Sequence, residues 1–308
     1  MIFIDGVGIG KEDYEFNPFF KFGFKTFSNL FSEIPSLKKQ VLISERSFGK
    51  DNIFLFPSDA CLGIEGLPQS GTGQTSIFCG VNASKVIGKH FGPYPYSTLI
   101  PIIAEKNIFK YYLSKNEKVF FANAYPQIFF DYISKGSFGK SGKSRLSVTT
   151  LSCKLNGMKI NTVTDVRRGK AITAEITNER WNVKLKYNLP VISSKTAAKS
   201  LLKIAAQNSF TVYEYFLTDH IGHRRYDGET SKTINILDEF LYSIITEMSE
   251  KNMSLIVCSD HGNFEDLSIK THTLNPSLTI TAGKYAEVLF NEIKDITQIK
   301  PAIIKYCK

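Results

Sequence analysis

The sequence predicts an α/β fold in which helices cover both faces of a doubly wound, mostly parallel sheet, with a small inserted cap. Short apolar runs alternate with helical segments along the 308 residues, which is typical of such a sheet. The runs at residues 1–4, 210–217 and 254–258 are each closely followed by acidic residues or histidines. Ligands bind at the carboxyl edge of an open α/β sheet, and we expect the functional site there.

Composition excludes several classes of protein. The 43% hydrophobic content is ordinary for a globular chain, and no apolar run reaches the roughly 18 residues of a membrane span. The net charge of +9 comes mostly from scattered lysines, which favours a solvated surface over a nucleic-acid face. A positive field also suits a small anionic substrate, which is the partner we expect.

The cysteines and the first residues of the chain indicate the cellular compartment in which the protein is expected. The five cysteines are odd in number and form no CxxC pair, so neither a disulfide framework nor a cysteine zinc site is expected. The first residues lack the basic-then-apolar pattern of a secretory signal. We therefore expect a cytoplasmic protein.

The first predicted element is a buried parallel strand at residues 1–4, with Asp5 at its carboxyl end. The glycines that follow are spaced GxGxG rather than GxGxxG, which argues against a dinucleotide loop, and a simple turn remains open. An aromatic-rich helix is predicted at residues 20–31, and short strands at 41–44 and 53–56.

Residues 67–75 form the stretch around which the chain is organised. A turn containing Ser70, Gly71, Thr72 and Gly73 leads into a helix that we expect to begin near Gln74. Unpaired backbone N–H groups and the helix dipole favour an anion at such a position. A nucleophile that must hold a phosphoryl group would gain from it.

Residues 131–189 differ from the rest and are predicted to form the cap, with the core at 1–130 and 190–308. The loop at 136–145 resembles a phosphate-binding loop, but Ser137 stands where that motif requires glycine. A mobile loop or a solvated basic face are the alternatives. The candidate substrate-binding residues of this region are Lys143, Arg145, Arg167 and Arg168.

The remaining elements complete the alternation. Helices are predicted at residues 97–108, 145–155, 196–206, 230–248 and 286–293. Strands are predicted at residues 118–122, 170–176, 210–217, 254–258 and 278–281.

Acids and imidazoles gather in the segments that follow the strands. Asp219 and His223 are spaced i and i+4, so on a helix both side chains face one metal ion, which His272 would complete. An exposed helix pair and an ordinary loop histidine are the alternatives. Because three of the five histidines fall in these segments, we favour the metal interpretation.

A second metal site is predicted from Asp5, Asp260, His261 and the hydroxyl of Ser70, although Asp260-His261-Gly262 alone could be a turn. Carboxylate and imidazole ligands suit zinc or manganese. Two ions about 4 Å apart would hold the attacking and leaving oxygens of an in-line displacement, and one would lower the pKa of Ser70.

Five motifs occur in the order found in the alkaline phosphatase superfamily, and the chain most resembles the branch of cofactor-independent phosphoglycerate mutase and phosphopentomutase. Nucleotide pyrophosphatases share a looser pattern. The resemblance covers roughly residues 1–100 and 195–308. The motifs are Asp5-Gly6, Ser70-Gly71-Thr72-Gly73, Asp219-x-x-x-His223, Ser259-Asp260-His261-Gly262-Asn263 and His272-Thr273-x-Asn275-Pro276.

The resemblance implies a role for each ligand. Asp219, His223 and His272 would bind one metal ion. Asp5, Asp260 and His261 would bind the other, and Ser70 would be the metal-bound nucleophile that is transiently phosphorylated. In the phosphomutases the nucleophile stands two residues before a Val-Gly or Thr-Gly pair, which selects Ser70 over the neighbouring threonines.

Two departures of this chain from the mutase pattern favour hydrolysis over a phosphomutase reaction. The mutase pattern continues with histidine where this chain has Gln74, and the 131–189 segment is small for a cap that must retain a phosphorylated intermediate. The sequence therefore predicts a two-metal phosphohydrolase of a small phosphoester. A phosphomutase, and a catalytically silent protein that binds metal and anion, are the alternatives.

Overall fold

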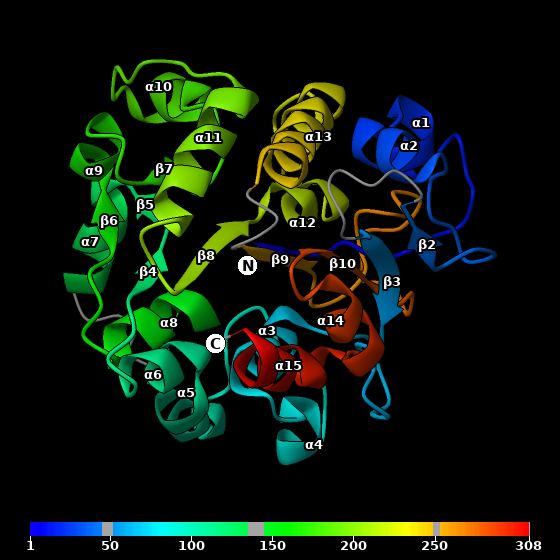
Figure 1. Ribbon diagram of the computed structural model, residues 1–308, viewed down its shortest axis with the longest axis horizontal. Helices are drawn as coiled ribbons and strands as arrows, with labels where there is room; N and C mark the ends of the chain where they lie inside the picture. Colours follow the sequence, from blue (N-terminus) through cyan, green and yellow to red (C-terminus); the bar gives the residue numbers. More distant parts are fainter. Residues whose placement is uncertain (45–51, 135–144, 249–252, 308) are drawn as a thin grey trace.

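The computed structural model describes residues 1–44, 52–134, 145–248 and 253–307. A seven-stranded sheet runs through the middle of the molecule (Figure 1). From edge to edge its strands are β2 (Leu42–Ile43), β3 (Phe54–Ser58), β10 (Ser277–Gly283), β9 (Ser254–Cys258), β1 (Ile2–Ile4), β8 (Phe210–Tyr215) and β4 (Val119–Phe121).

Four neighbouring strands, β9, β1, β8 and β4, are parallel. Strand β10 is antiparallel to both β9 and β3, and β2 is antiparallel to β3. The register pairs Phe3 with Cys258, which places Asp5 and Asp260, two residues further along each strand, at the same carboxyl edge. The predicted mostly parallel α/β sheet is confirmed.

Helices cover both faces of the sheet (Figure 1). Those on one face are α1 (Pro18–Phe22), α2 (Lys25–Phe31), α11 (Ser194–Ala205), α12 (Leu217–Gly222) and α13 (Thr230–Glu247). Those on the other face are α3 (Ser70–Cys79), α4 (Ala83–Ile87), α5 (Ile100–Lys106), α6 (Ile108–Leu113), α8 (Val148–Leu155), α14 (Ala286–Glu292) and α15 (Ile299–Tyr306). No helix in these ranges is long and apolar enough to cross a bilayer.

A second, three-stranded parallel sheet lies beyond β4 (Figure 1). It consists of β6 (Asn161–Thr162), β5 (Asn123–Tyr125) and β7 (Ile172–Thr173), with α7 (Gln127–Ser134), α9 (Val163–Arg167) and α10 (Glu179–Leu185) around it. The proposed division into core and cap at 131–189 stays a prediction.

Several predicted elements differ from the structure, among them two helices and a strand. The helix at 20–31 is two helices, because Gly23 has a φ of 77° and ends the first. The helix at 97–108 begins as a 3-10 turn and is interrupted at Asn107, whose side chain caps α6. The strand at 170–176 shortens to Ile172–Thr173.

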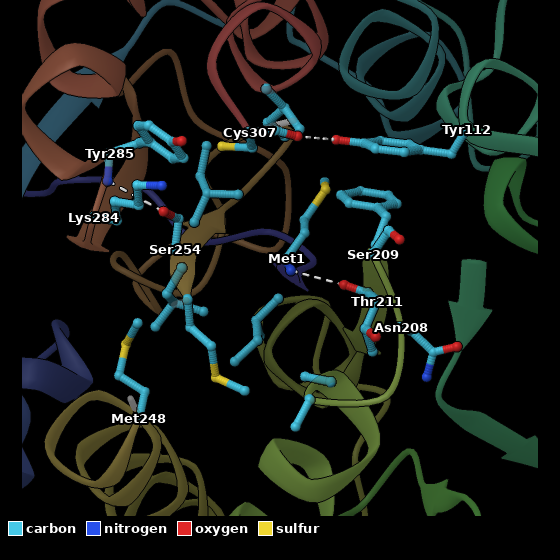
Figure 2. Close-up of a pocket in the computed structure, with 18 of the residues that line it drawn as sticks. Met1, Tyr112, Asn208, Ser209, Thr211, Met248, Ser254, Lys284, Tyr285 and Cys307 are labelled. Atoms are coloured by element: carbon cyan, nitrogen blue, oxygen red, sulfur yellow. Dashed lines mark hydrogen bonds between the residues drawn. The ribbon is translucent and has the colours of Figure 1, made fainter. Parts of the chain in front are cut away.

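The opposite, amino-terminal edge of the sheet holds a cavity of about 1020 Å³ (Figure 2). Met1 lies near its centre and donates from its backbone nitrogen to the Thr211 carbonyl at 2.8 Å. Most of the residues that line it are apolar, and they come from strands and connecting segments as well as from helices. None of the metal-ligand candidates lines this cavity, so it is separate from the site described next.

Candidate metal centre

The structure brings all seven candidate ligands and nucleophile residues to the carboxyl edge of the sheet. They come from the segments that follow β1, β3, β8 and β9 and from the loop that precedes β10. Short side-chain contacts connect them into one continuous cluster of Asp5, Ser70, Asp219, His223, Asp260, His261 and His272.

Asp219 and two histidines form the first group. The Asp219 Oδ1 atom lies 3.3 Å from Nε2 of His223 and 3.5 Å from Nε2 of His272. Each imidazole turns its Nδ1 to a backbone carbonyl, that of Lys270 at 2.8 Å and that of Pro68 at 2.6 Å. Because Nδ1 of each histidine donates to a carbonyl, Nε2 of each carries a lone pair. The two Nε2 atoms lie 3.0 Å apart, so their lone pairs are directed at the same point. That arrangement fits metal-binding histidines held by second contacts.

The second group contains Asp5, Asp260 and His261, all buried. The His261 Nε2 atom lies 3.4 Å from Asp5 Oδ1 and 3.5 Å from Asp260 Oδ2. Asp5 Oδ1 and Asp260 Oδ2 are buried and have no hydrogen-bond partner among the described residues. Buried carboxylate oxygens are rarely left unpartnered, so this donor set fits a bound cation.

Burial sets the protonation of the second group. It raises the pKa of Asp5 well above the usual range, and the charge of Asp260 raises it further. Burial also raises the pKa of Asp260 to about 7, with Asp219 adding to the shift, and lowers the pKa of His261 to about 3. Because a cation requires the carboxylates ionised, its binding releases protons and weakens as the pH falls.

The first group behaves differently in the metal-free protein. Burial alone would raise the pKa of Asp219, but its contacts with the protonated forms of His223 and His272 outweigh burial and lower that pKa overall. The contact with Asp219 in turn raises the pKa of His223, so a cation that binds there displaces a proton. The amide of Asn263 also donates to Asp219 Oδ1 at 2.8 Å, which fixes the orientation of the carboxylate.

Ser70 is the first residue of α3, four residues earlier than the predicted start near Gln74. Its Oγ lies 3.0 Å from Nε2 of His261. The two glycines of the motif are required by close packing: a Cβ on Gly73 would lie 2.9 Å from Cβ of Asp260, and one on Gly71 would lie 2.2 Å from the Tyr94 carbonyl oxygen. The Gly-Thr-Gly sequence therefore belongs to a helix that approaches the site closely.

Glu265 is a buried residue that sequence reasoning missed. Its Oε2 accepts from the backbone nitrogens of Gly8 at 2.9 Å and Asn263 at 2.8 Å. Its Oε1 accepts from Thr273 Oγ1 at 2.5 Å and Asn275 Nδ2 at 3.0 Å. One carboxylate thus connects the three segments that carry Asp5, Asp260 and His272. Its position two residues after the Asp-His-Gly-Asn motif is the only signal in the sequence.

Replacing Glu265 with glutamine is expected to lower zinc affinity about 10- to 100-fold, as for other residues that orient metal ligands. The NH₂ group of the new glutamine would face the N–H and O–H donors that now bond to the Glu265 carboxylate. The three segments that this carboxylate connects would then separate. A competitive zinc titration measures the change. The exposed Glu239→Gln on α13 is the matched control, and unchanged affinity in Glu265→Gln would show that this residue does not position the ligands.

Glu214 is a second buried acid that the sequence concealed, because it lies within the apolar run of β8. Thr149 Oγ1 donates to its Oε1 at 3.0 Å, and its Oε2 has no hydrogen-bond partner among the described residues. Burial raises the pKa of Glu214 to about 8. Its charge also contributes to the raised pKa of Asp5.

Glu214→Gln is expected to change how stability depends on pH in the metal-free protein. Between the unfolded pKa of 4.5 and the folded pKa of about 8, the folded state holds the extra proton. The free energy of unfolding therefore falls as the pH rises through this window. Glutamine keeps the acceptor for Thr149 but does not titrate, so the stability of wild type relative to the variant should decrease from pH 5 to pH 8. Urea unfolding at both pH values measures this difference, and a constant difference would contradict the prediction.

The candidate substrate-binding residues that the structure describes do not lie together. Arg145 lines a pocket beside the cluster, which is described below. The Arg167 guanidinium donates to the Tyr187 carbonyl at 2.9 Å, and Arg168 is exposed at the end of α9. Lys143 lies outside the described residues. Binding of substrate by these four residues stays a prediction.

Together, a twisted α/β sheet and two adjoining carboxylate–imidazole groups at its carboxyl edge define a metal-binding α/β protein. The sequence model of the Metalloenzyme superfamily matches residues 155–308, half of the chain and the part that carries Asp219, His223, Asp260, His261 and His272. The chain belongs to this superfamily, and the resemblance to the alkaline phosphatase superfamily is confirmed.

Comparison with individual proteins agrees with this assignment. The chain is 28% identical over 123 residues to the 2,3-bisphosphoglycerate-independent phosphoglycerate mutase of Mycoplasmopsis pulmonis (strain UAB CTIP), covering 38% of this chain and 24% of that protein. It is 26% identical over 123 residues to the enzyme of the same name from Mycoplasma genitalium (strain ATCC 33530 / DSM 19775 / NCTC 10195 / G37), with the same coverage. The match thus spans about a quarter of the length of these relatives.

A solved structure shares the fold over nearly the whole chain. The alkaline phosphatase from the Antarctic bacterium TAB5 superimposes with a TM-score of 0.51 at 14% identity, covering 99% of this chain and 96% of that one. At that identity the likeness shows the fold alone.

Proposed function

We propose that this protein is a metal-dependent phosphohydrolase that cleaves a small phosphomonoester through a phosphoserine at Ser70. The observation that carries the proposal is the contact between the Ser70 hydroxyl and His261, a residue of the second group whose ligand atom also lies within 4.8 Å of ligand atoms of Asp219 and His272 in the first. A hydroxyl at the first position of a ten-residue helix also lies where an anion is favoured.

The ligand set suits two divalent cations, zinc or manganese, because it offers carboxylates and imidazoles but no thiolate. Asp219, His223 and His272 would hold one ion, and Asp5, Asp260 and His261 the other. When bound, such ions supply Lewis-acid stabilisation of the charge on a transferring phosphoryl group.

The chain's own residues orient the nucleophile. Nδ1 of His261 faces the Gly262 carbonyl at 3.4 Å, so in the metal-free protein its Nε2 accepts from the Ser70 hydroxyl, and the same nitrogen would hold the ion when one is bound. The low pKa of His261 keeps this imidazole neutral. Ser70 is only 5% exposed, which limits the access of bulk water to the reacting oxygen. The neighbouring hydroxyls of Thr72 and Thr75 instead donate to carbonyls of their own helix turn, which favours Ser70 as the nucleophile.

Hydrolysis is preferred because Gln74 replaces the histidine of the mutase pattern and the 131–189 segment is short. A phosphomutase is the second candidate, since the curated relatives carry that name. We also propose a reducing, cytoplasmic setting, which the five free cysteines support.

Phosphate release tests the proposed function. The metal-stripped protein is reconstituted separately with zinc and with manganese and given a phosphomonoester, a phosphodiester and 3-phosphoglycerate. We expect free phosphate from the monoester with metal and none without it. Conversion of 3-phosphoglycerate to its 2-isomer without free phosphate would instead establish the mutase. No reaction of any kind from protein that has bound metal would contradict both.

A further inference from the structure

A pocket of about 360 Å³ is lined by residues of segments that contact or lead into the candidate metal centre. Most of its wall is aromatic, although aromatic residues are only 13% of the chain. Ser147 and Thr150 of the α8 N-terminus supply hydroxyls to the lining. The aromatic and charged residues that line it are Tyr94, Tyr125, Phe129, Tyr132, Phe216 and Arg145.

The pocket adjoins the reacting hydroxyl and the metal ligands through neighbouring residues. The Tyr94 carbonyl packs so closely on Gly71, the residue after Ser70, that no side chain fits between them. Phe216 is the N-cap of α12, the helix that carries Asp219. A substrate with its phosphate at Ser70 therefore has this pocket as a neighbour for the rest of the molecule.

The lining chemistry fits a flat ring. Aromatic walls bind planar groups by offset stacking or edge contacts. Tyr125 and Phe129 lie against each other with ring centroids 4.1 Å apart and ring planes tilted by 32°. Phenolic hydroxyls at the wall can hydrogen-bond the polar edges of such a ring, whereas the Ser147 and Thr150 hydroxyls bond to each other in the α8 cap. Arg145 is exposed, and a guanidinium at a pocket wall can stack on a planar ring.

A small polyhydroxylated acid such as a phosphoglycerate would find fewer matching groups here. Recognition of its carboxylate and hydroxyls requires several convergent polar or charged side chains, and one guanidinium and a few hydroxyls line this pocket. Ligand pockets of this size that are mostly aromatic with a few polar atoms instead suit ring-bearing molecules.

We propose that this pocket is a subsite for the ring of the substrate, and that the preferred substrates are phosphomonoesters bearing a nucleobase or a similar planar aromatic ring. The inference rests on the proposed function, because it assigns the remainder of the ester that Ser70 would attack.

The experiment compares adenosine 5′-monophosphate with ribose 5-phosphate, which have the same primary leaving oxygen and differ in the base. Equilibrium binding to the zinc-loaded Ser70→Ala protein is measured first, by calorimetry, and does not depend on turnover. We expect adenosine monophosphate to bind about tenfold more tightly or better, in the range that stacking of one base provides. Turnover of both esters by the wild-type protein is measured second.

Two variants test whether the preference for adenosine monophosphate over ribose 5-phosphate comes from this pocket. Tyr132→Leu, at a half-exposed position on the pocket rim, and Phe216→Leu should each lower the ratio of the two affinities several-fold. Tyr14→Leu is the matched control, because Tyr14 is 66% exposed and does not line the pocket. A ratio that decreases in the first two variants and not in the control supports the subsite.

The outcomes separate the two proposals. Equal binding of the two esters, or a ratio that both pocket variants leave unchanged, overturns the subsite whatever the turnover shows. A clear preference in binding without phosphate release from either ester supports the subsite and overturns the proposed hydrolase. Cleavage of ribose 5-phosphate as efficient as that of the nucleotide, together with equal binding, leaves the hydrolase standing and overturns the ring preference.

Discussion

Asp260→Asn is expected to lose bound metal and at least about 100-fold of the phosphate-releasing activity while the protein stays folded. Asp260 is fully buried, and its Oδ2 is one of the unpartnered oxygens that face His261. An asparagine offers one neutral oxygen in place of a carboxylate, so the second group of ligands loses a charge that a cation requires. The Gly6 backbone nitrogen, which donates to Asp260 Oδ1 at 3.3 Å, can donate to the amide oxygen instead.

Elemental analysis of the dialysed protein, phosphate release and thermal unfolding together test this prediction. The exposed Asp131→Asn on α7 is the control and should keep metal, activity and stability. Because the raised pKa of Asp260 means that the metal-free protein holds its proton below pH 7, we expect the metal-free variant to be as stable as metal-free wild type there. Full metal content and full activity in Asp260→Asn would show that the ligand assignment is wrong.

Ser70→Ala is expected to abolish turnover, by at least about 10³-fold, while metal binding remains. Alanine removes the oxygen that contacts His261 but preserves α3, whose first turn depends on backbone contacts such as Gly73 N–H to the Gln69 carbonyl at 2.8 Å. Metal content and phosphate release are measured on the same preparation.

Thr75→Val is the control for Ser70→Ala. It removes a buried hydroxyl of the same helix and keeps the side-chain shape. That hydroxyl donates to the Gly71 carbonyl at 2.7 Å, so we expect activity within a few-fold of wild type. Turnover that survives in Ser70→Ala and disappears in Thr75→Val would assign the nucleophile to the threonine.

The sheet was predictable from the sequence because its central strands are buried on both faces and read as apolar runs. Ile2–Ile4 and Ser254–Cys258 lie in the structure where the runs indicated, with Asp5 and Asp260 beyond them. A parallel sheet brings such strand ends to one edge, so segments far apart in the chain could be assigned to one site before any contact was known.

Residues that act through tertiary packing were not predictable. The start of α3 was placed late because glycines at positions 71 and 73 normally indicate a turn, and only the close approach of Tyr94 and Asp260 explains them. Glu214 carries no local signal, and Glu265 carries only its position after the Asp-His-Gly-Asn motif. Their importance comes from partners such as Gly8 and Thr149 that are distant in sequence. Single-residue patterns cannot reveal such contacts.

The most direct test of the central claim is to find where the phosphate resides during turnover. Metal-reconstituted wild-type protein is mixed with excess phosphomonoester and quenched in acid at a series of times, and its peptides are analysed by mass spectrometry. We predict phosphate on Ser70, absent from metal-free protein and from Ser70→Ala. Phosphate on any other residue, with Ser70 unmodified at every time, would contradict the account.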